Sequence, residues 1–74
     1  MRTTKEHFNW CKERAFQYLD MGDAQQGFTS FVSDMSANPD TSKRMNPILN
    51  AIGMMEILRG PEAVRRWIDG FPSP

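Results

Sequence analysis

His7 and Cys11 are the two residues whose types and spacing could do chemistry. They lie four residues apart in a segment predicted to be helical, so their side chains would share one face. A thiol beside an imidazole could be a nucleophile with its base, or half of a zinc site. Structural zinc takes four N or S ligands, and the chain has one His and one Cys. A cysteine nucleophile also needs an orienting group, an oxyanion hole and a pocket. We therefore expect Cys11 in the core and His7 near solvent, with no metal and no catalysis.

The remaining candidates for chemistry are weaker still. Asp20 and Asp23 flank a predicted turn, where helix capping explains Asp23. The stretch "GDAQQG" at residues 22–27 lacks the Lys-Ser/Thr pair of a phosphate-binding loop. The sequence therefore predicts a protein that is not an enzyme and that binds no cofactor.

Length and composition indicate one small globular domain over residues 1–74. The chain is 39% apolar and 24% charged, which is ordinary for a folded protein. Its single cysteine excludes an internal disulfide and favours a reducing cytoplasm. No apolar run approaches the roughly 20 residues of a membrane span, and the first residues are too polar for a signal peptide. We expect a cytoplasmic protein without a membrane partner.

Nine basic and nine acidic residues cancel, but they are unevenly spread. Residues 15–42 contain four aspartates and no base, whereas the segments before and after each carry a net charge of +2. Binding nucleic acid through its phosphates needs a clustered basic surface. The charge distribution therefore predicts that nucleic acid is not a partner.

Capping and turn signals divide the chain into four predicted helices. Thr3 and Glu6 form a capping box, Gly22 suits the left-handed end of a helix, and Asp23 with Gln26 could cap the next one. Further on, proline residues punctuate the chain at 39, 47 and 61. The helices are expected at about residues 4–21, 24–37, 47–59 and 61–69, with a polar connection at 40–46 that has room for one loose turn.

No segment shows the period-2 alternation of a strand. The expected fold is all-α: a compact four-helix domain built of two successive helical hairpins. The first helix should bury one face, made of Phe8, Cys11, Ala15, Tyr18 and Leu19. The second helix should bury Ala24, Phe28, Phe31 and Met35.

The third predicted helix is apolar around nearly its whole circumference, from Ile48 to Leu58. Such a helix is normally central and touches neighbours on several sides. Met54 and Met55 are accordingly interpreted as core filler. The alternative is that short helices leave part of this segment uncovered, which would favour self-association or a partner groove.

The tight turn at Gly22 is compatible with a DNA-reading helix-turn-helix or with a repeat-type hairpin. The second helix has no Lys or Arg and carries Asp34, which is the wrong sign for reading DNA. The spacing instead resembles a tetratricopeptide hairpin, in which small and aromatic residues alternate around a turn glycine. The residues that carry this resemblance are Ala15, Tyr18, Gly22, Gly27, Phe31 and Pro39.

Cys11 departs from that pattern, because a large aromatic residue usually occupies its place, and Asp34 stands where a small apolar residue is usual. The likeness covers about half of the chain and no second repeat is visible, whereas repeat arrays need about three. It therefore implies the shape of a hairpin rather than a peptide-binding array.

Three longer segments resemble a widespread group of small proteins encoded by bacteriophages and prophages. They are "WCKERAFQYLDMGD" at residues 10–23, "SDMSANPDT" at 33–41 and "RRWIDGF" at 65–71. The resemblance implies a phage product in the bacterial host cytoplasm. It also implies a protein that binds a host protein and modulates or inhibits it, with the transcription machinery as one candidate.

Two surfaces are predicted to bind such a partner. A helical wheel places Trp10 and Met21 opposite the core face of the first helix, with Arg14 and Gln17 between them. Trp and Arg dominate binding hot spots, so this side is a candidate interface, unless Trp10 is buried within the protomer.

Arg65 and Arg66, together with Arg59, form the only basic cluster of the sequence. This cluster either steers the protein toward an acidic partner or is simply solvated. The alternative to a host partner is a homodimeric structural or assembly protein of a phage that uses the same apolar surface for itself. The predicted partner-binding residues are Trp10, Arg14, Gln17, Met21, Arg65 and Arg66.

Overall fold

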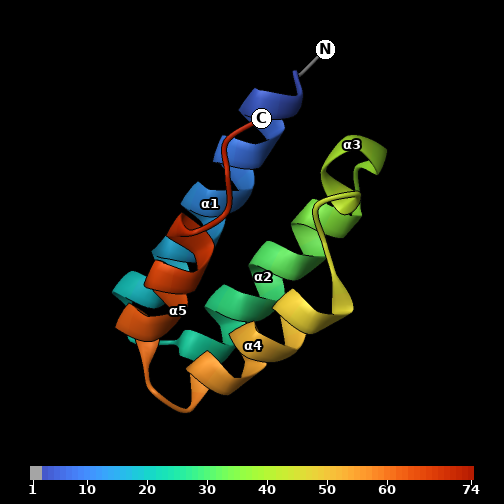
Figure 1. Cartoon of the computed structure of the whole chain (residues 1–74). Coiled ribbons are helices and arrows are strands. Elements are labelled where there is room, and N and C mark those ends of the chain that lie inside the picture. Colours follow the sequence, from blue (N-terminus) through green and yellow to red (C-terminus); the bar gives the residue numbers. More distant parts are fainter. Residues whose placement is uncertain (1–2) are drawn as a thin grey trace.

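The computed structural model describes residues 3–74, and within that range it contains five helices and no strand (Figure 1). The all-α prediction is therefore confirmed. The four longer helices end within two residues of the ranges expected from the sequence. The helices are α1 (Thr4–Asp20), α2 (Ala24–Ser36), α3 (Pro39–Ser42), α4 (Pro47–Ile57) and α5 (Pro61–Asp69).

The predicted caps explain where the first two helices begin. The Thr3 hydroxyl accepts from the Glu6 amide at 3.1 Å, and the Glu6 carboxylate accepts from the Thr3 amide at 3.3 Å, which completes the capping box. The Asp23 carboxylate accepts from the Gln26 amide at 3.0 Å, while the Asp23 amide donates to the Tyr18 carbonyl. The second cap therefore satisfies the start of α2 and also ties it to the end of α1.

Helix α3 lies in the segment predicted to be a polar connection. The Asn38 side chain accepts from the Asp40 amide at 2.8 Å and starts the short helix at Pro39. Thr41 is fully buried, and its hydroxyl donates to the Met35 carbonyl at 2.6 Å. Thr41 thus satisfies an acceptor at the end of α2, a role that the hydropathy of the segment does not reveal.

Helices α1 and α2 run antiparallel and form the most extensive helix pair (Figure 1). They pack closely at Gly27, where a Cβ would lie 3.3 Å from the Ala15 carbonyl oxygen and 2.7 Å from Leu19 Cγ. Gly22, at φ +83°, makes the turn between them in the left-handed region. Glycine at both positions is therefore a geometric requirement of this hairpin.

Helix α5 lies antiparallel along α1 and is fastened by two ion pairs. Lys12 Nζ is 3.2 Å from Asp69 Oδ1, and Arg65 is 2.5 Å from Asp20 Oδ1. The Arg65 guanidinium also lies over the ring of Phe16, with its Cζ 4.3 Å from the ring centroid. These contacts fix the register of α5 against α1.

The buried core is drawn from α1, α2, α5 and the segment after α5. Around the ring of Phe31, the ring of Trp67 lies at 5.8 Å and that of Phe71 at 5.3 Å between centroids. Phe71 therefore folds back over the last turn of α5, as its position after Gly70 predicts. The core residues are Phe8, Cys11, Ala15, Leu19, Phe31, Met35, Val64, Ile68 and Phe71.

Helix α4 meets the rest of the molecule through its backbone at Gly53, the only residue of this helix that is buried. A Cβ there would lie 2.6 Å from Phe28 Cε1 and 2.7 Å from Trp67 Cε2. The Trp67 indole N–H also donates to the Leu49 carbonyl at 3.0 Å. Helix α4 therefore rests on α2 and α5 along one side.

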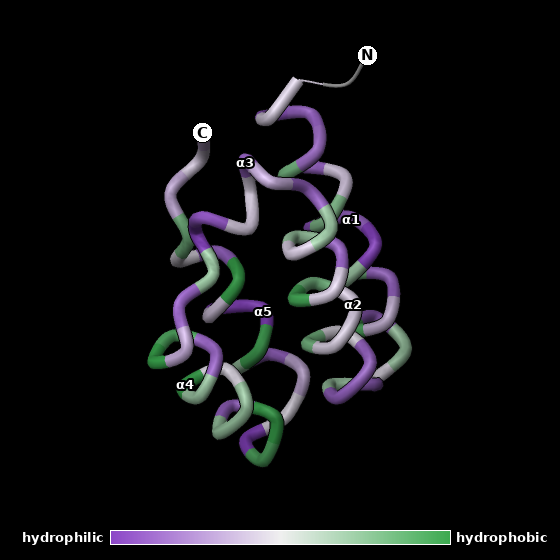
Figure 2. Tube along the Cα trace, turned by 90° about the vertical axis from the view of Figure 1, so that its right-hand side faces the viewer, coloured by the Kyte–Doolittle hydropathy of each residue, from purple (hydrophilic) through white to green (hydrophobic). Residues whose placement is uncertain are grey.

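The prediction that the third long helix is central is wrong, as is the interpretation of its methionines as core filler. Met54 is 59% exposed, Met55 is 67% exposed and Leu58 is 91% exposed. Figure 2 shows apolar residues along α4 at the edge of the fold. The physical reason is that α2 and α5 cover only the side of α4 that carries Gly53, with Ile57 packed against the core, so most of the other apolar side chains of α4 face outward.

We predict that Gly53→Ala lowers the free energy of unfolding by about 1–2 kcal/mol. The added methyl meets two rigid rings, and overpacking of that kind costs about 1–3 kcal/mol, more than the gain of about 1 kcal/mol in helix propensity. Chemical denaturation followed by circular dichroism measures the change. Met54→Ala is the matched control on the same helix and should stay within about 0.5 kcal/mol of the parent. A Gly53→Ala variant as stable as the parent would contradict the docking geometry of α4.

Candidate functional site

The His7–Cys11 pair forms as predicted, but its hydrogen bonding does not suit nucleophilic catalysis. Cys11 Sγ lies 3.5 Å from His7 Nε2, and the same nitrogen lies 2.9 Å from the Asp34 carbonyl oxygen. A carbonyl only accepts, so Nε2 must carry the proton in that contact and has no lone pair for the thiol proton. Cys11 is also fully buried. This arrangement therefore favours the structural role expected from the sequence.

Within residues 3–74, no group of three or more His, Cys, Asp or Glu side chains is placed to hold a metal ion. Over the same residues, no helix combines the length and the apolar character needed to cross a bilayer.

Trp10 is half-buried and packs against the core, so the structure answers the question that the sequence left open. Its ring stacks on that of His7 at 5.6 Å, and the Arg14 guanidinium lies 4.8 Å from its centroid. Arg14 Nε in turn lies 2.8 Å from Asp34 Oδ2. Trp10 and Arg14 are thus brought together, but both also contribute to the packing of α1 against α2.

Gln17 and Met21 continue the same side of α1 toward its C-terminal end. Both are exposed, and Met21 is 72% exposed. The four predicted residues of this side, which we call the α1 stripe, are Trp10, Arg14, Gln17 and Met21.

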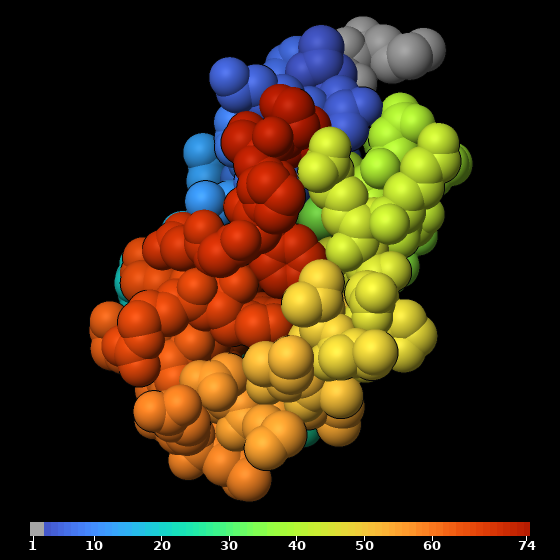
Figure 3. Space-filling view, in the orientation of Figure 1, coloured from blue at the N-terminus to red at the C-terminus, as the bar shows by residue number. Residues whose placement is uncertain are grey.

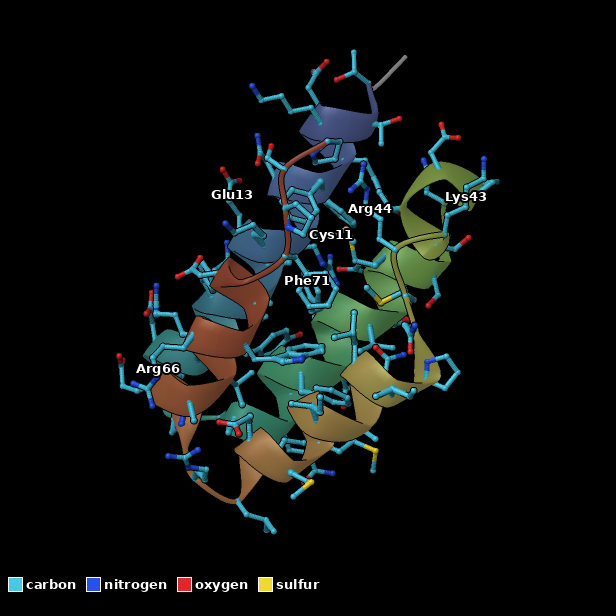
Figure 4. All side chains as sticks on the ribbon, in the orientation of Figure 1. Cys11, Glu13, Lys43, Arg44, Arg66 and Phe71 are labelled. Carbon is cyan, nitrogen blue, oxygen red and sulfur yellow. The ribbon has the colours of Figure 1, made fainter. Side chains whose placement is uncertain are left out.

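The predicted basic cluster is divided. Arg65 is engaged with Asp20, and Arg59 Nη1 lies 3.5 Å from Glu56 Oε1. Arg66 is exposed on the outer side of α5, and no described residue forms an ion pair with it (Figure 4). The adjacent arginines therefore serve different purposes, and only Arg66 keeps a charge available to a partner.

A pocket of about 280 Å³ lies between α4 and the C-terminal end of α5. Trp67 and Phe71 form part of its wall, with their rings in an edge-to-face arrangement at 5.0 Å. The segments that line it meet on the face shown in Figure 3, where α4 is yellow to orange and the C-terminal segment is red. This α4–α5 pocket is lined by Leu49, Arg66, Trp67, Gly70, Phe71 and Pro72.

Sequence reasoning predicted Arg66 but missed the other residues of the pocket. Trp67 was expected only as an apolar residue of the last helix, and Phe71 only as a cover for its final turn. The pocket forms because Gly53 brings α4 against Trp67, while the chain after α5 folds back so that Phe71 packs on the Trp67 ring. The spacing of Trp67, Gly70 and Phe71 indicates that two aromatic rings lie close together at the end of the last helix. It does not indicate that α4 lies opposite these rings.

The outward side of α4 is a second surface, separate from the pocket. Six outward positions, five on α4 and one at its C-cap, are apolar and exposed. Contiguous apolar exposure of this kind is unusual on a monomer and typically marks an interaction site. We call this surface the α4 face: Ile48, Ala51, Ile52, Met54, Met55 and Leu58.

No protein-family model, curated protein or solved structure gave a significant match to this chain.

We predict that Trp10→Ala destabilises the fold by about 1–3 kcal/mol, because a half-buried ring loses part of the 3–5 kcal/mol typical of a fully buried one. Thermal and urea unfolding measure the loss. Met21→Ala on the same α1 stripe is the control and should change stability by less than about 0.5 kcal/mol, since this side chain is exposed. Equal effects of the two substitutions would show that the packing of Trp10 against the core is unimportant.

Proposed function

We propose that this chain is a small non-catalytic protein that binds another protein through the α4–α5 pocket and thereby modulates it. The observation that carries the proposal is the aromatic wall of this pocket, made by Trp67 and Phe71. Interfaces concentrate their binding energy in a few well-packed anchors, and an apolar pocket of this size accepts one large side chain.

The charge of the pocket lining also favours a protein as the partner. Arg66 is the single charged residue among the described residues that line the pocket. An apolar anchor followed or preceded by a carboxylate would satisfy both the rings and this arginine. A short acidic and amphipathic segment of the partner fits this description.

We infer that the chain is built of two successive hairpins, α1 with α2 and α4 with α5, and this division gives the proposal its architecture. The hairpin of α1 and α2 supplies most of the buried core, and the hairpin of α4 and α5 supplies the pocket. A stable first hairpin would hold the second in place, so the pocket would be available before a partner arrives. Pre-organisation of this kind lowers the entropic cost of binding.

The identity of the partner rests on the resemblance to small phage-encoded proteins. That resemblance favours a bacterial host protein, with the transcription machinery as one candidate, and a cytoplasmic setting. The absence of an activated nucleophile at Cys11 and His7 supports modulation by binding rather than by chemistry.

The test is capture of a bacterial partner by tagged protein, followed by measurement of its affinity for the parent and for two variants. Leu49→Glu places a charge in the pocket, and Met21→Glu places the same charge on the α1 stripe. We expect Leu49→Glu to weaken binding at least about 10-fold, because the carboxylate must be buried when the anchor enters. Met21→Glu should leave the affinity unchanged.

The two variants also separate the pocket from the surface predicted by the sequence. If Met21→Glu abolishes binding and Leu49→Glu does not, the α1 stripe is the interface and the pocket proposal is wrong. Circular dichroism of both variants checks that each remains folded. Trp67 fluorescence in a Trp10→Phe background gives an independent signal when the pocket is filled.

A second candidate function is favoured by the α4 face. A homodimeric structural or assembly protein would explain six exposed apolar side chains on one helix. This candidate and the first are compatible, because the pocket and the α4 face share no residue.

A further inference from the structure

We propose that the α4 face is covered by the α4 face of a second copy, with the two helices antiparallel about a twofold axis at the level of Gly53. This inference concerns a different surface from the pocket; it rests on the second candidate function, the homodimer, and specifies which surfaces meet and in which orientation. It rests on the composition, the geometry and the flanking charges of α4.

The composition of the α4 face suits a second copy better than an occasional partner. Interfaces that form and dissociate are only about as apolar as the rest of a protein surface, whereas homodimer interfaces are more apolar. All six residues of the face lack polar groups, and Leu58, Ile48 and Met55 are the most exposed of them. Each copy supplies the same apolar face, so pairing of two copies removes both faces from water.

The spacing of the face is self-complementary. At about 100° per residue, the six residues cover about 160° of the helix, and Ala51 and Met55 lie on either side of its middle. These two residues are also equally far from Gly53 along the chain. A twofold axis at that level therefore sets the small side chain of one copy beside the large side chain of the other, as interdigitating packing requires.

The same symmetry pairs the ends of the face. Ile48 and Leu58 are equally distant from Gly53, so each would lie near the other residue in the second copy. The remaining two residues of the face, Ile52 and Met54, are related in the same way. In a parallel arrangement each residue would instead meet its own copy, and the large residues would face one another.

The charges that flank α4 favour the antiparallel arrangement. Lys43 and Arg44 precede the helix at the α3 end (Figure 4). At the other end Arg59 lies 3.5 Å from Glu56, so Glu62 carries the carboxylate that is left over there. Lys43, Arg44 and Glu62 form no ion pair with a described residue. Antiparallel copies bring Lys43 and Arg44 of one toward Glu62 of the other, whereas parallel copies bring Lys43 and Arg44 of both together.

The size of the face sets the expected strength. Helix α4 has 11 residues and is about 16 Å long. A single helix of this length offers less contact area than the roughly 800 Å² per subunit of a standard stable interface. We expect a dimer with a dissociation constant of about 1–100 µM. The pockets would stay open, because Leu49 lies on the inner flank of α4 and outside the face.

Sedimentation velocity across a range of protein concentrations tests the dimer. The parent should shift from monomer to dimer, and Met55→Glu should raise the dissociation constant at least about 100-fold, since each dimer would bury two charges. Met21→Glu is a closely matched control, because Met21 is 72% exposed and Met55 67% exposed. It should dimerise like the parent. A parent that is monomeric throughout, or a Met55→Glu variant that still dimerises, overturns the proposal.

Oxidative cross-linking tests the orientation. Ile48→Cys and Leu58→Cys are made separately in a Cys11→Ala background and then mixed. Ten residues separate the two positions, which is about 15 Å along the helix, whereas a disulfide needs Cα atoms within about 7 Å. Antiparallel pairing predicts that the mixture cross-links and that neither variant does so alone. Cross-linking of each variant with itself would show parallel pairing and overturn the inference.

The outcome is distinguishable from that of the pocket experiment. Met55→Glu should leave capture through the pocket unchanged, and Leu49→Glu should leave dimerisation unchanged. If the parent is monomeric and Met55→Glu abolishes capture, another protein covers the α4 face and this inference is wrong.

Discussion

The position of one indole ring determines how the second half of the chain is attached to the first. The Trp67 ring packs against Phe28 and Phe31 of α2 and against Phe71, while its N–H donates to the Leu49 carbonyl of α4. It therefore joins α2, α4, α5 and the C-terminal segment at one point. The rings pack inside the fold, while the indole N–H finds its acceptor on α4 at a position that is still open to solvent.

The position of the Trp67 ring explains why one side of α4 is packed against the fold and the other side is exposed. The indole occupies the space that a larger residue on α4 would otherwise fill, so the helix approaches through Gly53. A glycine contact brings the backbones close but buries little side-chain area. The residues of the α4 face are consequently left on the outer side, and the pocket opens where Leu49, on the inner flank, meets the ring.

Local signals allowed much of the fold to be predicted, and tertiary packing decided the remainder. The capping box at Thr3, the turn at Gly22 and the buried face of α1 depend on neighbours within a few residues, so the sequence specifies them. The environment of α4 depends on how many helices surround it, and an apolar circumference does not reveal that number. The α4–α5 pocket was missed for the same reason, because Leu49 and Phe71 meet only in the folded chain.

Since Gly53 is the only fully buried residue of α4, the exposed positions of the α4 face are nearly released from the demands of folding. Mutations there would be filtered mainly by what the helix touches outside its own chain. Among diverging descendants of this gene, α4 should consequently change in step with its binding counterpart, while α1 and α2 change slowly. Mutations in a short helix of this kind can create a binding surface for a new partner while the core residues stay unchanged.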